Sequence, residues 1–144
     1  MYRIQEVGGT PGGEAFLLTS GGRSALLDTG FSYCAEALVQ NIRSVLGKNP
    51  LDLILLTHSH YDHVCGTMRC LREWPDAAVI ASGYTKYVFT RPSALNLMRK
   101  MSAAAAFAAG SENINCDVEH LRVDRTVAEG DLVELGNLHL RVME

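Results

Sequence analysis

The sequence contains no apolar run long enough to cross a lipid bilayer, which needs roughly 18 or more such residues in succession. Its first residues, 1–5, also lack the apolar core of a secretory signal peptide. Neither sign of charge dominates, since 13 lysines and arginines stand against 16 aspartates and glutamates, for a formal net charge of -3. A chain without a basic excess has no field that would attract a polyanion such as nucleic acid. These absences predict a cytoplasmic protein that binds neither membrane nor nucleic acid.

Cysteine pairs of the Cys-x-x-Cys type are also missing. The four cysteines are Cys34, Cys65, Cys70 and Cys116, and we expect free thiols because cytosolic proteins rarely hold disulfides. Cys65 lies two residues after His63, which leaves two interpretations open. It could be a soft metal donor, or a small residue packed at the start of a helix, and the second is favoured.

The hydrophobic pattern predicts a single α/β domain over residues 1–144. Short apolar runs bounded by glycine-rich or polar turns predict strands at 2–7, 14–20, 23–28, 51–56 and 77–81, and a later hairpin of 127–135 with 138–142. Apolar residues at helical spacing predict helices at 31–46, 63–72, 84–89 and 92–109.

The segment from Thr57 to His63 concentrates three histidines and one aspartate directly after the predicted strand 51–56. Open α/β sheets bind their ligands at the carboxyl ends of strands. Imidazole and carboxylate groups are also the donors that zinc and similar metals prefer. His58 and His60 are one residue apart and can point to the same side, toward one ion. The adjacent Asp62 and His63 can face a second ion.

The pattern His-x-His-x-Asp-His after a hydrophobic strand resembles the metallo-β-lactamase-fold hydrolases. A second element, residues 25–30 with the sequence Ala-Leu-Leu-Asp-Thr-Gly, resembles the strand of that family that ends in Asp-x-Gly. The resemblance implies the front part of a metallo-β-lactamase-type αββα sandwich. It implies a first metal held by His58 and His60 and a second held by Asp62 and His63. Asp28 would orient these ligands from beneath.

The same resemblance implies a metal-dependent hydrolase of a small-molecule substrate. Two Zn²⁺ ions, or Fe or Mn in some members, would activate a water molecule, and Asp62 could accept its proton. Thioester, lactone, phosphodiester and β-lactam substrates all remain open, and β-lactam is the least expected. No coherent nucleophilic triad is present in the sequence.

Several family ligands are not found, namely a third histidine in a Pro-Gly-His segment and a later Asp and His. The last residues, 138–144, resemble the strand that precedes Pro-Gly-His. We therefore expect a truncated, incomplete domain with weak activity or none. Strand alternation places His139 on the solvent face, whereas a substitute-ligand role for His120 stays open.

Two alternatives to a self-sufficient enzyme follow from the missing ligands. The chain could be a non-catalytic metal-binding or assembly module, or one half of a site that another polypeptide completes. An incomplete sandwich should also expose apolar surface, expected at Ile54, Leu56, Val79 and Leu140, and such surface recruits partners. The sequence therefore predicts a homo-oligomer.

Overall fold

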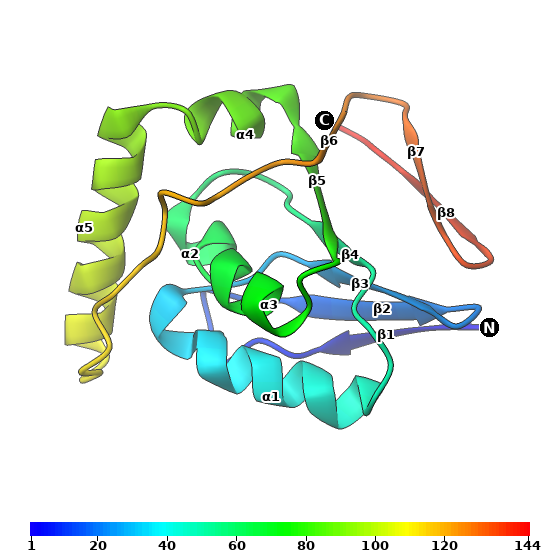
Figure 1. Ribbon diagram of the computed structural model, residues 1–144, viewed down its shortest axis with the longest axis horizontal. Helices are drawn as coiled ribbons and strands as arrows, with labels where there is room; N and C mark the ends of the chain where they lie inside the picture. Colours follow the sequence, from blue (N-terminus) through cyan, green and yellow to red (C-terminus); the bar gives the residue numbers. More distant parts are fainter.

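The computed structural model describes all of residues 1–144 and contains a six-stranded mixed sheet and a separate two-stranded hairpin (Figure 1). The sheet has the order β1 (Tyr2–Glu6), β2 (Phe16–Ser20), β3 (Arg23–Leu27), β4 (Leu53–Leu55), β5 (Ala78–Ser82) and β6 (Arg125–Val127). The first three strands are antiparallel, and β3 to β6 are parallel. The hairpin pairs β7 (Leu132–Leu135) with β8 (Leu138–Arg141). The predicted α/β class is confirmed.

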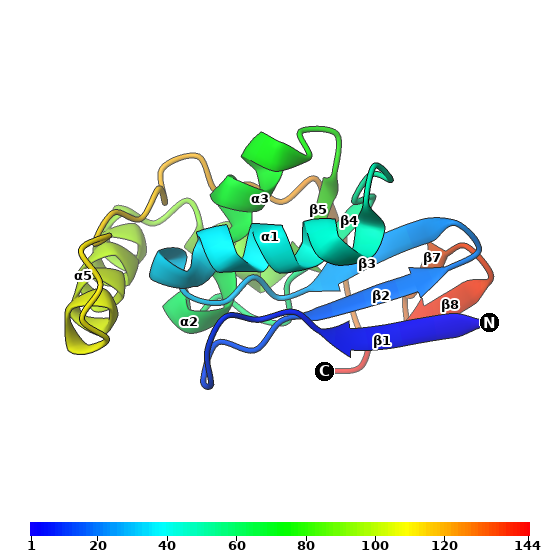
Figure 2. The same ribbon diagram turned by 90° about the horizontal axis from the view of Figure 1, so that it is seen from below.

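The helices connect the parallel strands and extend beyond the sheet. They are the 3-10 turn η1 (Ser32–Cys34) and the α-helices α1 (Ala35–Leu46), α2 (Tyr61–Val64), α3 (Thr67–Glu73), α4 (Gly83–Val88) and α5 (Pro92–Ala108). None of them combines the length and the apolar character that crossing a bilayer requires. Figure 2 shows α1 and α3 together on one face of the sheet, with α5 beyond its end.

The main core lies between the sheet and the helices α1 and α3. Side chains alternate along a strand, so every second residue points to this face. From the sheet come the fully buried Leu26, Ile54 and Val79, and α1 contributes Leu38 and Ile42 at helical spacing. The buried residues of the strands and of α1 therefore pack into one apolar layer. This layer holds in place the edge of the sheet that carries the histidines and aspartates.

The opposite face of the sheet is apolar but only partly covered. The hairpin β7–β8 lies over Leu18 and Ala25 and buries them with Leu135. Half-buried apolar side chains surround this small cluster, namely Phe16, Leu27, Leu53, Leu55, Leu138 and Leu140.

The prediction of uncovered surface named mostly the wrong residues. Ile54, Leu56 and Val79 are buried, because they point to the face that α1 and α3 cover. The neighbouring Leu53 and Leu55 point to the opposite face and are half-buried. Leu140, the fourth predicted residue, does lie at this partly covered face.

Two predicted elements are each divided in the structure. The predicted strand 127–135 is wrong as one continuous strand. β6 ends at Val127, and residues 128–131 form a turn, in which the Ala128 amide donates to the Asp131 carboxylate at 2.9 Å. Its second half is β7, which forms the predicted hairpin with β8. The predicted helix 63–72 is also wrong as a continuous element. It breaks at Cys65 and Gly66, between α2 and α3.

Close packing of Gly66 explains this break. A Cβ atom at Gly66 would lie 2.2 Å from the carbonyl oxygen of Thr29, the second residue after β3. The hydroxyls of Thr29 and Thr67 are 3.1 Å apart beside this contact, and both residues are buried. The backbone at the start of α3 therefore lies directly against the chain that leaves β3.

We expect Gly66→Ala to destabilise the fold by about 1–3 kcal/mol or more, because the added methyl group must displace a buried backbone carbonyl. Urea unfolding of the purified variant measures this change. Gly83→Ala is the matched control, since a methyl group added there would meet no atom within 4 Å and the backbone needs no positive φ. Equal unfolding free energies for both variants would contradict the expected crowding at Gly66.

We also propose that a second copy of the chain covers the half-buried leucines of the hairpin face. Sedimentation velocity should show self-association over about a hundred-fold range of concentration. Leu140→Gln should weaken the association, whereas Leu97→Gln, at a 59% exposed position on α5, should leave it unchanged. A monomer throughout the series would rule this contact out.

Candidate metal centre

The candidate centre lies at the carboxyl edge of β3 and β4. These strands are parallel, with Leu27 beside Leu55, so the chain leaves both at the same edge. The Asp28 amide continues the ladder by donating to the Leu55 carbonyl at 2.9 Å. Asp28 and the segment that begins at Thr57 therefore become neighbours although they lie 29 residues apart in the sequence.

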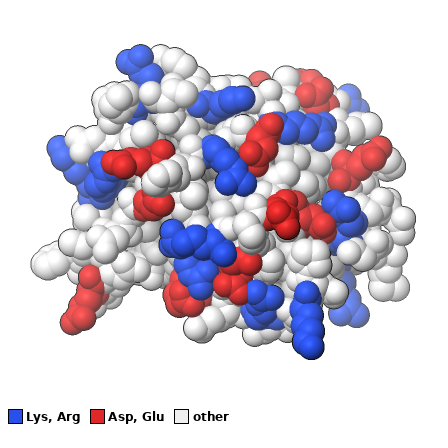
Figure 3. Space-filling view, in the orientation of Figure 1, with Lys and Arg blue, Asp and Glu red and all other residues white.

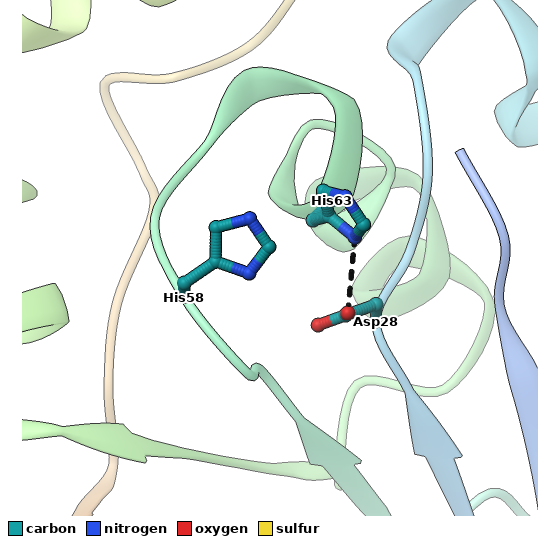
Figure 4. Close-up of side chains that lie close together, drawn as sticks. All are labelled: Asp28, His58 and His63. Atoms are coloured by element: carbon teal, nitrogen blue, oxygen red, sulfur yellow. Dashed lines mark hydrogen bonds and ion pairs between the residues drawn. The ribbon is translucent and has the colours of Figure 1, made fainter. Parts of the chain in front are cut away.

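The Asp28 carboxylate accepts three hydrogen bonds from this segment. One oxygen accepts from the Thr57 amide at 2.8 Å, and the other accepts from the Thr57 hydroxyl at 2.7 Å and from His63 Nδ1 at 3.1 Å. Figure 4 shows the contact between Asp28 and His63. Asp28 is also the one non-glycine residue with positive φ, at 59°. That left-handed conformation costs about 1–2 kcal/mol, which the three hydrogen bonds offset.

These hydrogen bonds determine which ring nitrogen of each histidine is free. A carboxylate can only accept, so His63 Nδ1 donates to Asp28 and its Nε2 keeps a lone pair. The Thr57 hydroxyl donates its hydrogen to Asp28. Its oxygen is therefore the acceptor in the hydrogen bond with His58 Nδ1 at 2.8 Å. His58 Nε2 is then free as well. One carboxylate thus orients two imidazoles, each with a ring nitrogen that keeps its lone pair.

The structure brings the predicted site residues together to different degrees. Asp28, His58 and His63 each have a ligand atom within 4.8 Å of the other two (Figure 4). The ring of His60 lies 4.7 Å from that of His58, and Asp62 Oδ2 lies 3.5 Å from His63 Nε2. The rings of His58 and His63 are closer still, with centroids 4.3 Å apart, so the shortest ring contact joins the two predicted pairs. The ligand roles stay predictions.

The surroundings of His58 disfavour its charged form. Burial lowers the pKa of His58 below 6.5, and the neighbouring His63 and His60 lower it further. A metal binds only the neutral imidazole, so protons compete less with a metal at His58 than at a free histidine.

Three other residues considered from the sequence lie outside the cluster. His120 is exposed and lies 3.0 Å from the Asp117 carboxylate. His139 is exposed, as strand alternation predicts. Cys65 is buried and accepts a hydrogen bond from Ser102 in α5 at 3.3 Å, which favours the packing interpretation over a metal donor.

Thr57 was missed as a functional residue in the sequence. Its only signal there is a hydroxyl directly before the histidine motif, and such a residue usually caps a turn. Its role follows from the distance to Asp28 on one side and to His58 on the other.

A cleft of about 690 Å³ opens beside His58 and His60. More than half of its lining residues are hydrophobic, among them Leu55, Ile80 and Val127. Arg141 provides a cation in the same lining. The cleft has the size and apolar character of small-molecule sites.

The sequence model of the metallo-beta-lactamase superfamily matches residues 8–143. The chain belongs to this superfamily. It is similar to a hydroxyacylglutathione hydrolase of Synechococcus sp., with 51% identity over 49 residues, covering 33% of this chain and 19% of the relative. It is also similar to a ribonuclease of Thermus thermophilus, with 31% identity over 128 residues, covering 89% of this chain and 28% of the relative.

Solved structures of the superfamily share the fold. A subclass B3 metallo-beta-lactamase of Bradyrhizobium japonicum superposes with a TM-score of 0.68 at 25% identity, covering 96% of this chain and 47% of that one. A metallo-beta-lactamase of Cronobacter sakazakii gives 0.67 at 22% identity, covering 96% and 49%. The chain therefore spans about half the length of these structures and at most 28% of the curated relatives named above.

We expect Thr57→Val to lower zinc affinity about 10–100-fold, because His58 loses the acceptor that fixes its tautomer. Isothermal titration with Zn²⁺ measures the affinity, and nitrogen-15 NMR of the metal-free protein reports the tautomer of His58. Thr57→Ser is the matched control, since it keeps the hydroxyl and should retain both properties. A Thr57→Val protein with unchanged tautomer and affinity would disprove the relay through Thr57.

Proposed function

We propose that this chain forms the metal-binding part of a cytoplasmic, metal-dependent hydrolase that acts on a small molecule with a reactive carbonyl group. Members of the superfamily are metallo-hydrolases. The observation that carries the proposal is the Asp28 network, which engages Nδ1 of His58 and of His63 in two rings whose centroids lie 4.3 Å apart and leaves each Nε2 with its lone pair. His58 and His63 are only partly buried, so their rings are accessible to an ion from solvent.

The donor set fits zinc. Imidazole nitrogens and carboxylate oxygens are common Zn²⁺ ligands, and Fe or Mn could bind the same set. We assign His58 and His60 to one ion and Asp62 and His63 to a second. When bound, the ions would supply Lewis-acid activation of water and of the substrate oxygen.

The residues of the chain itself have three tasks in this proposal. His58 and His63 would hold the metals, and Asp28 orients both rings, that of His63 directly and that of His58 through Thr57. Asp62, 28% exposed and beside His63, can hold a proton at its free carboxylate oxygen. The cleft next to His58 offers space for a small substrate beside the centre.

Each proposed metal has two protein donors in this chain, whereas a catalytic zinc usually has three. We therefore propose weak metal binding and weak activity for the chain by itself. A homodimer partner or another polypeptide could complete the ligand set. The remaining alternative is a non-catalytic metal-binding or assembly module.

The surface supports a small substrate rather than a polyanion. Positive and negative side chains alternate over the face seen in Figure 3, and the formal net charge is -3. The relative that hydrolyses hydroxyacylglutathione favours a thioester, and the apolar cleft suits its acyl portion. Phosphodiester hydrolysis is the second candidate, because the ribonuclease relative matches 89% of the chain.

We expect the purified chain to bind zinc and to lose that binding in the His58→Ala/His60→Ala double variant, because two of the proposed donors are removed. Elemental analysis and zinc titration measure the stoichiometry and affinity. A double variant at the exposed, distant histidines, His120→Ala/His139→Ala, is the matched control and should bind as the wild type does.

Hydrolysis of a thioester and of a phosphodiester is then assayed on the zinc-loaded chain. Zinc-dependent turnover that the first double variant loses supports the hydrolase. Tight zinc binding without turnover of any ester supports the assembly module instead. If excess zinc does not bind at all, the proposed metal centre is wrong for this chain.

A further inference from the structure

An arginine without a partner lies in the cleft beside the candidate metal centre. Arg141 is the one lysine or arginine among the residues that line this cleft. Eight of the ten arginines in the chain have a polar or aromatic partner. Six form ion pairs, one donates to a backbone carbonyl and one lies over a tyrosine ring, namely Arg23, Arg43, Arg69, Arg72, Arg99 and Arg122, then Arg125, then Arg91. Only Arg141 and Arg3 have none, and Arg3 lies at a different cavity.

The order of the strands separates Arg141 from the histidines. The histidine segment follows β4, whereas β5 lies beside β4 and β6 lies beyond β5. The turn after β6 holds the end of β8 through two hydrogen bonds. The Gly130 amide donates to the Val142 carbonyl at 2.9 Å, and the Val142 amide donates to the Asp131 carbonyl at 2.8 Å. Neighbouring strands lie about 4.8 Å apart, so roughly 10 Å separates the chain at β4 from the chain at β6, where Arg141 is attached.

The surface between these two ends of the cleft is apolar. Leu55 of β4, Ile80 of β5 and Val127 of β6 all line it. Tyr84 of α4 lines it as well, and this residue is 71% exposed, so its ring is open to contact with a ligand. A ligand that reaches from the histidines to Arg141 must therefore have an apolar middle part.

The charge of Arg141 is not neutralised within the chain. Glu144 is the one acidic residue in the lining, and it forms no ion pair with Arg141, while its amide donates to the Glu129 carboxylate. A guanidinium group presents its donors in a planar fork that matches the two oxygens of a carboxylate. At the end of an apolar surface, such a group selects a ligand with an apolar body and an anionic end.

We propose that Arg141 determines the substrate specificity of this cleft by binding a carboxylate at the far end of the acyl chain of the substrate. The inference rests on the proposed function, since it takes the reacting carbonyl group to lie at the metal centre, beside His58 and His60. The acyl chain then runs along the apolar lining past β5 and β6. The substrate class is a thioester or ester of a dicarboxylic acid whose second carboxyl group is free.

This assignment separates charged from neutral acyl groups. A simple fatty-acyl ester fills the apolar part of the cleft but leaves the Arg141 guanidinium to water, so it gains no charge-assisted hydrogen bond. The discrimination does not depend on a bound metal, because Arg141 is not among the proposed metal donors. Binding to the cleft can therefore be measured separately from hydrolysis.

The first test measures binding to the full, metal-free chain at about pH 8, where an ordinary imidazole is neutral. The probes are 6-oxoheptanoate, which has a ketone at one end and a carboxylate at the other, and its neutral methyl ester. We expect NMR titration to show that the carboxylate binds about 5-fold or more tightly than the ester. Arg141→Gln should remove this preference, and Arg141→Lys should keep most of it. Arg3→Gln is the matched control, since Arg3 is also exposed and without a partner but lies outside the cleft.

The second test measures hydrolysis by the zinc-loaded chain, with the N-acetylcysteamine thioesters of adipic acid (one carboxyl group free) and of hexanoic acid. Arg141→Gln should raise KM for the adipoyl thioester about 5-fold or more, and it should leave kcat and the hexanoyl thioester unaffected. Equal binding of the two probes to the wild-type chain, or a preference that survives in Arg141→Gln, would overturn the inference even if thioesters are hydrolysed. Selective probe binding without any turnover would support the carboxylate site and contradict the proposed hydrolase.

Discussion

The acceptor capacity of one carboxylate, that of Asp28, determines the geometry of the candidate centre. Its three hydrogen bonds attach the histidine segment to the end of β3 at both Thr57 and His63. Without them the segment would be an exposed polar loop with many conformations. With them, two imidazoles have defined tautomers and lie with ring centroids 4.3 Å apart. The organisation of the centre therefore precedes any metal, since it follows from the pairing of β3 with β4.

The two faces of the sheet differ in how well they are covered. The face under α1 and α3 is a complete core, and it holds the strand ends in place. The other face is apolar and carries only the hairpin β7–β8. The solved structures that share this fold are about twice as long as the chain. The candidate centre thus rests mainly on the helix-covered face.

Much of this organisation could be predicted from local sequence patterns. The strand before the histidines, the helix over 35–46 and the metal-type residues at a strand end are local features, and local patterns specify them. The break at Gly66 could not be predicted, because it depends on the carbonyl of Thr29, far away in the sequence. The role of Thr57 depends on a long-range contact of the same kind, that with Asp28. The prediction of uncovered residues was wrong at Ile54 because it assigned the wrong strand face to the helices.

The left-handed backbone of Asp28 has a consequence for how such a chain can change through mutation. At most positions the backbone conformation suits the functional residue, so replacing that residue does not stabilise the fold. At this position glycine would suit the backbone better than aspartate does, because it adopts positive φ without a steric penalty. If selection for the activity were relaxed, the single substitution Asp28→Gly would relieve the backbone strain and also remove the hydrogen bonds that order the centre. At this position the order of the centre requires aspartate, whereas the backbone conformation favours glycine.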